Sequence, residues 1–314
     1  MSRADKIFKG MCTSILEESR GKKIRVRPHW EDGTPAYVIK KFGVCNTYDL
    51  RDEFPAITIR KTAIKSASDE MLWIYQKKSN NINDLNSHVW DEWADEKGSI
   101  GKAYGYQVRQ KAIYPLEERY RDIKTETDLS ALSEAYSMYP SAFINISNDN
   151  VYLDQMDAVL YTLKHDPFSR RIMINLWNVS ELHEMNLQPC AYSCTFNVTD
   201  EGYVKPILNL LLNQRSQDVL AANNWNVVQY AILLMMVAQV SNMIPGKLIH
   251  MIADAHIYDR HIPIIEELIQ RDEYPAPTVM LNPDIKNFYD FKTSDIVVSN
   301  YFTQQQIKDI PIAI

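Results

Sequence analysis

Cys190 and Arg215 have the residue types of a nucleophile and of the cation that could activate it. Cys190 follows a proline and opens an alternating run to Phe196, which predicts a strand. An Asp-Glu-Gly turn leads to a second expected strand, 204–212, which ends in the polar run that contains Arg215. A guanidinium beside a thiol favours the thiolate, the reactive form. The pattern indicates covalent catalysis, against the alternative of an inert cysteine packed in a strand.

Polar residues at a spacing of two mark a second candidate site. Asp254, His256 and Tyr258 lie in a segment that is expected to be a strand, so they share one face. A metal site built from His250, His256 and His261 is the alternative, although this spacing matches no strong metal motif.

Glu70 allows two interpretations, and Asn226 has an ordinary structural one. Glu70 lies in a mostly apolar helical segment, where burial would raise its pKa, or it is simply an acid on the helix surface. Asn226 directly precedes an apolar helical segment, where asparagine is a common N-cap.

The elements that position these residues do not alternate regularly, so the sequence predicts the α+β class. Helices are expected at 4–19, 66–77, 152–165, 227–244 and 262–271. Further strands are expected at 37–50, 56–60, 171–177 and 248–258. We predict one catalytic domain over 1–314, with the charged, tyrosine-rich segment 117–150 as a peripheral insertion or small subdomain.

The composition narrows the class of protein. A net charge of −6 argues against a general DNA or RNA binder. The 9 glycines form no dinucleotide or P-loop motif, so side chains would have to hold a phosphate. Neither an apolar signal core nor a membrane span is expected. Cys190 and Cys194 would lie about 13 Å apart on a strand, too far to bridge, so reduced thiols in a cytoplasmic protein are expected.

Four motifs together resemble the folate-dependent thymidylate synthases: PCAYSCTF, NQRSQD, NNWN and DAHIY. The resemblance extends from about Arg27 to Ile314. It implies a large mixed β-sheet that packs against helices and uses one sheet face for dimerisation. It also implies the reductive methylation of dUMP to dTMP with 5,10-methylenetetrahydrofolate, which leaves as dihydrofolate, without a metal.

The resemblance implies roles for individual residues. The catalytic set would be Cys190, Glu70, Tyr104, Asn226 and Arg215. The residues that bind dUMP would be Arg27, Arg170, Arg171, Arg215, Ser216, Asp218, Asn226, His256 and Tyr258. The residues that bind folate would be Val89, Trp90, Trp93, Leu187, Asp218, Ala313 and Ile314.

In the family the cysteine adds to C6 of the uracil ring, and the glutamate acts as general acid and base through water. Asn226 matches the asparagine that reads the pyrimidine edge. Arg170 and Arg171 match a pair that reaches into the partner's site, which implies a homodimer with shared sites. The apolar tail, 310–314, matches the segment that closes over folate.

The sequence also departs from the family pattern. Ala191 replaces a common histidine, 221–225 replaces an L-G-x-P-F segment, and Ile252-Ala253 replaces a glycine pair. Either Arg25 or Arg27 could meet the phosphate. A pyrimidine-nucleotide hydroxymethylase on the same fold is the nearest alternative function. A nucleotide- or RNA-binding protein without turnover is the second alternative, but binding alone needs no nucleophile.

Overall fold

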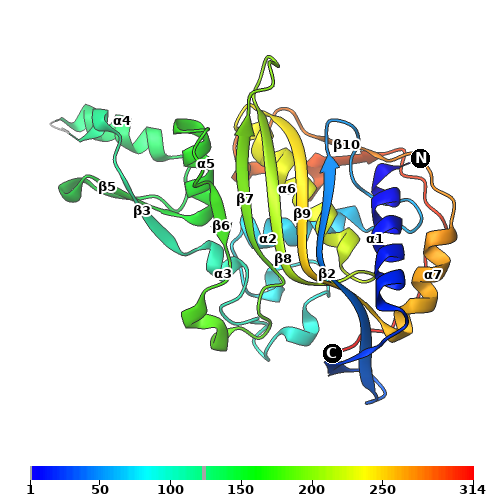
Figure 1. The fold of residues 1–314 in the computed structure, drawn as a ribbon. Coiled ribbons are helices and arrows are strands. Elements are labelled where there is room, and N and C mark those ends of the chain that lie inside the picture. Colours follow the sequence, from blue (N-terminus) through cyan, green and yellow to red (C-terminus); the bar gives the residue numbers. More distant parts are fainter. Residues whose placement is uncertain (1, 122–124) are drawn as a thin grey trace.

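A six-stranded mixed sheet forms the centre of the computed structural model, which describes residues 2–121 and 125–314. The strand order is β1-β2-β9-β8-β7-β6 (Figure 1). The strands are β1 (Ile24–His29), β2 (Pro35–Asp49), β6 (Met173–Asn175), β7 (Ala191–Thr199), β8 (Ile207–Asp218) and β9 (Ile244–Tyr258). Only β8 and β9 pair in parallel, because helix α6 (Asn223–Val240) connects them as a crossover. The predicted α+β class and mixed sheet are confirmed.

Helices cover the sheet and hold it in place. Figure 1 shows α2 (Ile64–Tyr75) and α6 behind the central strands, and α1 (Arg3–Ser19) beside β2. Helix α7 (Ile262–Gln270) packs on α1. The predicted helices at 4–19, 66–77 and 262–271 therefore form within two residues of their expected ends. A hairpin of β10 (Thr278–Leu281) and β11 (Ile296–Ser299) follows α7.

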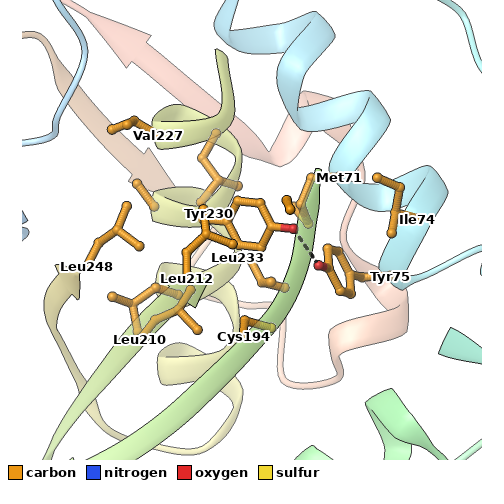
Figure 2. Close-up of a cluster of buried hydrophobic side chains, with 14 of the residues drawn as sticks. Met71, Ile74, Tyr75, Cys194, Leu210, Leu212, Val227, Tyr230, Leu233 and Leu248 are labelled. Carbon is orange, nitrogen blue, oxygen red and sulfur yellow. Dashed lines mark hydrogen bonds between the residues drawn. The ribbon is translucent and has the colours of Figure 1, made fainter. Parts of the chain in front are cut away.

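The core between α2, α6 and the sheet contains a pair of buried phenols. The hydroxyl groups of Tyr75 and Tyr230 lie 2.8 Å apart and point toward each other (Figure 2). Around them are apolar side chains from both helices and three strands, among them Met71, Cys194, Leu210, Leu212, Leu233 and Leu248. Helix α6 has no separate polar face, which suits a helix that is buried on most of its sides.

A smaller sheet lies at one side of the large one, next to β6 (Figure 1). It has the order β3-β5-β4, with β3 (Lys111–Pro115), β4 (Phe143–Asn145) and β5 (Asn150–Asp154). Helices α4 (Glu126–Tyr136) and α5 (Gln155–His165) accompany it. Segment 117–150 contributes α4 and β4, while its residues 122–124 lie outside the described part. Its assignment as an insertion stays a prediction.

A buried charged cluster joins this smaller sheet to the body of the protein. Lys78, just after α2, contacts the carboxylate of Asp154 and lies 3.8 Å from that of Asp157. Tyr289, in the segment after β10, donates its hydroxyl to Asp157. We call these four residues the junction cluster.

One predicted strand does not form and one predicted helix starts three residues late, and in both segments a side chain binds the backbone. Residues 56–60 form no strand, since the amides of Thr58 and Ile59 donate to the carboxylate of Asp5 at 2.8 and 3.2 Å. The helix expected at 152–165 begins only at Gln155, because Asp154 caps it and 150–154 pair as β5.

Several boundaries also differ from the prediction, among them the start of β9 at Ile244 instead of 248 and the end of α6 at Val240 instead of 244. Strand β8 starts at Ile207 and continues through Asp218, so Arg215 lies near the end of the strand, as expected. Strand β6 is only Met173–Asn175, shorter than the expected 171–177. Helix α6 begins at Asn223, so Asn226 lies in its first turn and is not its N-cap.

Candidate active site

One cavity of about 900 Å³ brings the predicted site residues together. The strands β8 and β9, the helices α2 and α6, the loop before β7 and the C-terminal tail contribute to its wall. Every predicted site residue lines it except Arg170 and Arg171: Arg27, Glu70, Val89, Trp90, Trp93, Tyr104, Leu187, Cys190, Arg215, Ser216, Asp218, Asn226, His256, Tyr258, Ala313 and Ile314. Arg25 is not part of the wall, so of the two candidate arginines it is Arg27 that faces the cavity.

Strand pairing places Arg215 beside Cys190. The amide of Arg215 donates to the carbonyl of Cys190 at 2.9 Å, and its Nη2 lies 3.7 Å from Sγ. The carbonyl oxygens of Gln188 and Pro189 accept from the same guanidinium at 2.8 and 3.0 Å. Burial raises the pKa of the thiol, and the charge of Arg215 only partly opposes it. The arginine acts in the expected direction, but burial outweighs it and favours the thiol form.

The carboxylate of Glu70 is buried and held by two indoles. Trp90 donates to Oε1 at 3.0 Å, and Trp225 donates to Oε2 at 2.6 Å. Burial raises the pKa of Glu70, while these two donors act to lower it. Gln229 also lowers it, although Nε2 of that amide has no hydrogen-bond partner among the described residues. Glu70 is thus a buried acid that faces the cavity and not a helix-surface acid, as the alternative proposed.

Tyr104 reaches Cys190 from the residue just before the short helix α3 (Gly105–Val108). Its hydroxyl accepts the amide hydrogen of Cys190 at 3.1 Å. Its backbone has a φ of 46°, a left-handed conformation that is strained for a residue other than glycine. The next residue must be small, because a Cβ at Gly105 would lie 2.1 Å from the carbonyl oxygen of Ser79.

The predicted polar face of β9 is present. The parallel register sets Ser216 opposite Asp254, and Asp218 opposite His256. Nδ1 of His256 lies 3.0 Å from Oδ1 of Asp254, and the rings of His256 and Tyr258 meet edge to face. All three residues of this face, Asp254, His256 and Tyr258, line the same cavity as Cys190.

Asp218 is bound tightly by its surroundings. The amides of Leu220 and Ala221 donate to its Oδ1 at 3.0 Å. Nδ1 of His261 lies 3.6 Å from the same oxygen, an ion-pair distance and not a hydrogen bond. Burial acts to raise the pKa of Asp218, but His261 and the amides outweigh it and the pKa is lowered. Asp218 therefore presents a carboxylate to the cavity.

Asn226 belongs to a chain of amides that sequence reasoning missed. Its Oδ1 accepts from Gln214 at 3.1 Å, and its Nδ2 donates to Gln229 at 3.0 Å. Gln214 in turn contacts Nε2 of His250 at 2.6 Å. Gln214 alternates with Ser216 and Asp218 along β8, and this spacing of two is the signal that could have identified it.

The C-terminal tail is fixed at the edge of the cavity. Ile314 and His29 exchange two backbone hydrogen bonds of 2.8 and 2.9 Å, and Ala313 pairs with Trp30. The side chain of Ile314 is still 55% exposed. The tail thus lines the cavity without filling it.

The remaining predicted residues and the rival metal site do not meet at this cavity. Arg170 and Arg171 are exposed and lie just before β6. His250 contacts Gln214, whereas His261 contacts Pro311 at 2.7 Å. Within residues 2–121 and 125–314, no group of three or more His, Cys, Asp or Glu side chains could hold a metal ion. In the same residues, no helix has the length and apolarity that crossing a membrane requires.

Comparison with known proteins identifies the family. The family model described as Thymidylate synthase matches residues 6–313. The chain belongs to the thymidylate synthase family. The thymidylate synthase of Bacillus licheniformis is 36% identical over 306 residues, which cover 96% of each chain. Thymidylate synthase 1 of Bacillus subtilis strain 168 is 35% identical over 307 residues, again 96% of each.

A solved structure shares the fold of the whole chain. The thermostable thymidylate synthase A from Bacillus subtilis aligns with a TM-score of 0.79 and 33% identity, over 100% of both chains. Thymidylate synthase function, a methyl transfer, follows from this membership. Membership in the family also implies dUMP as substrate and a folate as co-substrate. The alternatives of a hydroxymethylase and of a binding protein without turnover are not favoured.

Proposed function

We propose that this chain methylates dUMP with 5,10-methylenetetrahydrofolate through a covalent bond between Sγ of Cys190 and C6 of the uracil. The observation that carries the proposal is the cavity itself, where the thiol lies 3.7 Å from a guanidinium and shares the wall with a buried acid. Addition of the thiolate turns C5 into a carbon nucleophile, which unactivated uracil lacks. C5 then takes the one-carbon unit from the folate, which also supplies the hydride and leaves as dihydrofolate.

Glu70 and Tyr104 are the proposed proton-transferring groups. Burial keeps the pKa of Glu70 above its usual value, which suits an acid that must both give and take a proton near neutral pH. Tyr104 contacts both Cys190 and Trp90. Its hydroxyl accepts the amide hydrogen of Cys190, and its ring packs edge to face against that of Trp90. We assign removal of the C5 proton to this pair.

Recognition of dUMP follows from the donors in the wall. Arg27, Arg215 and Ser216 supply charge and a hydroxyl for the phosphate, because guanidinium groups bind phosphate dianions well. Asn226 presents a carbonyl and an amide to the base. His256 and Tyr258 are placed for the sugar 3′-hydroxyl.

The folate half of the cavity is aromatic and apolar. Val89, Trp90, Trp93 and Leu187 would contact the rings, while Asp218 would accept from the pterin edge. The tail residues Ala313 and Ile314 would close over the bound folate and exclude water.

A homodimer would complete the phosphate site, with Arg170 and Arg171 supplied by the partner subunit. Both arginines are exposed and lie away from their own cavity. The large sheet has exposed apolar side chains, including Phe42 at 84% and Met173 at 48%, which dimerisation would cover. The dimer is the arrangement typical of this fold, whereas these arginine contacts and a cytoplasmic location stay predictions.

Capture of the covalent intermediate tests the proposal. Incubation with 5-fluoro-dUMP and 5,10-methylenetetrahydrofolate should give an adduct on Cys190. The normal reaction removes a proton from C5, and a base cannot remove fluorine as a cation, so the reaction stops at the covalent adduct. Peptide mapping by mass spectrometry locates the adduct. Cys194, which is buried with 1% exposure, is the internal control and should stay unmodified. An adduct on Cys194, or none at all, would contradict the covalent mechanism.

A complementation experiment tests the shared sites. Cys190→Ala and Arg170→Ala variants, each inactive alone, are mixed under conditions that exchange subunits. Recovery of activity supports arginines that act across the dimer. A fully active monomer in analytical ultracentrifugation would contradict them.

A further inference from the structure

Trp225 makes a hydrogen bond to Glu70 that no sequence pattern predicted. Its Nε1 lies 2.6 Å from Oε2, while Nε1 of Trp90 lies 3.0 Å from Oε1. Trp225 comes from the first turn of α6 and Trp90 from the loop before the short 3-10 turn Asp91–Trp93. The two oxygens of the carboxylate are therefore held from opposite elements, and both indoles line the cavity.

We propose that Trp225 is a positioning residue for Glu70, which fixes the second carboxylate oxygen and favours the ionised acid. The reason is that an indole N–H can donate a hydrogen bond but cannot accept one. A proton on Oε2 would make that oxygen a poorer acceptor and weaken the bond from Trp225, and a proton on Oε1 would weaken the bond from Trp90 in the same way. This proposal rests on the proposed role of Glu70 as the proton-transferring group.

The other titratable groups that face Glu70 do not stabilise its negative charge, so this depends on neutral hydrogen-bond donors. Asp69, its neighbour in α2, acts to raise the pKa of Glu70 through its negative charge. The hydroxyl groups of Tyr104 and Tyr230, from α3 and α6, have pKa values raised by burial and are neutral. Glu70 makes no ion pair with a described residue, so its hydrogen bonds are what oppose burial.

The substitution Trp225→Phe isolates the N–H group. It keeps an aromatic ring at a half-buried position and removes the donor. Loss of one hydrogen bond to a charged group should raise the pKa of Glu70 by about one pH unit. Trp73→Phe is the matched control, because Trp73 is fully buried in the same helix as Glu70 and donates to the carbonyl of Asn81 at 2.9 Å instead.

Infrared titration of the whole protein measures this directly. The C=O stretch of a protonated carboxyl is assigned to Glu70 by its loss in Glu70→Gln, and its midpoint is followed against pH. The pH dependence of kcat is recorded on the same samples. We expect both midpoints to move upward in Trp225→Phe and to stay in place in Trp73→Phe.

The outcomes separate the two proposals. An infrared midpoint that does not move in Trp225→Phe overturns the role of Trp225. A midpoint that moves while the kcat profile stays unchanged supports Trp225 as the residue that positions Glu70 and refutes proton transfer by Glu70. If Trp225→Phe does not fold, Trp225→Leu removes the same donor and must shift the infrared midpoint in the same direction.

Discussion

Glu70 in the cavity and Asp154 in the junction cluster are two buried carboxyl groups whose pKa values shift in the same direction, although their surroundings differ. The pKa of each is raised, with burial as the largest cause. Asp154 contacts the ammonium of Lys78 and does not line the cavity. Glu70 meets only neutral N–H donors and does line it. A raised pKa therefore does not by itself distinguish the proposed catalytic acid from a structural one in this protein.

The difference between the two regions lies in what binds the charge. In the junction cluster a lysine compensates the carboxylates, so removal of one partner leaves an uncompensated buried charge. In the cavity, neutral donors hold the carboxylate while a proton can still reach it. The contrast predicts that changes in the cavity cost activity and that changes in the junction cluster cost stability.

Of three substitutions and one deletion that test this contrast, Glu70→Gln should have the largest effect. We expect kcat to fall by about 10²- to 10⁴-fold, because the amide cannot exchange a proton. Steady-state assays of dihydrofolate formation measure the loss. Binding of dUMP by calorimetry is the control and should change little. A variant with wild-type kcat would remove the distinction between the two carboxyl groups.

The same variant carries a stability prediction with a defined sign. The pKa of Glu70 is higher in the folded protein than in the unfolded chain, whose value is about 4.5. Its contribution to the free energy of unfolding is therefore fully present below that pH and is lost as pH rises through the folded value. Relative to wild type, Glu70→Gln should gain stability as pH rises above about 4.5, which urea denaturation at several pH values would measure. A constant difference across pH would show that Glu70 keeps its ordinary pKa.

Lys78→Met should lower stability more than activity, the opposite of Glu70→Gln. It leaves the carboxylates of Asp154 and Asp157 without their cation and should lower the free energy of unfolding by about 3–5 kcal/mol. We expect kcat to stay within a few-fold of wild type, because Lys78 does not line the cavity. Lys6→Met, at an exposed position of α1, is the control for loss of a surface charge. A large loss of kcat in folded Lys78→Met would connect the junction cluster to catalysis.

Asn226→Asp tests the amide chain within the cavity. Uracil presents an acceptor at O4 and a donor at N3, which a fixed asparagine amide matches with one donor and one acceptor. We expect the wild type to prefer dUMP over dCMP by about tenfold or more, and Asn226→Asp to lower that ratio. Asn213→Asp, on the same strand as Gln214 but outside the cavity wall, should leave the ratio unchanged. An unchanged ratio in Asn226→Asp would place base recognition elsewhere.

Deletion of Ile314 should have the smallest effect. The backbone of this residue is hydrogen-bonded to His29, but its side chain is half exposed at the edge of the cavity. We expect the KM for folate to rise by about fivefold, which corresponds to the hydrophobic free energy of burying part of one side chain. The KM for dUMP should change little. Some hydroxymethylated product should form when water enters. Ile314→Val should behave as wild type, and normal folate kinetics in the deletion would make the tail merely structural.

The sequence by itself indicated the fold class, and the resemblance of its motifs to a family implied site residues, of which all except Arg170 and Arg171 line the cavity. Those conclusions depend on local order along the chain. Alternation places Asp254, His256 and Tyr258 on one face, and the motifs around Cys190 and Arg215 stand at fixed intervals. The helices at 4–19, 66–77 and 262–271 follow from local apolar periodicity in the same way.

Only the tertiary structure decided which neighbours tune these residues. Asp5 binds the backbone of 58–59 and prevents the strand expected there, across more than fifty residues of sequence. Trp225 reaches Glu70, and His250 reaches Gln214, across separations that no local pattern encodes. The balance at Cys190, where burial outweighs the charge of Arg215, likewise depends on how the chain packs around the thiol. Periodicity specifies which face a side chain occupies, but desolvation and hydrogen bonding depend on what the fold brings to that face.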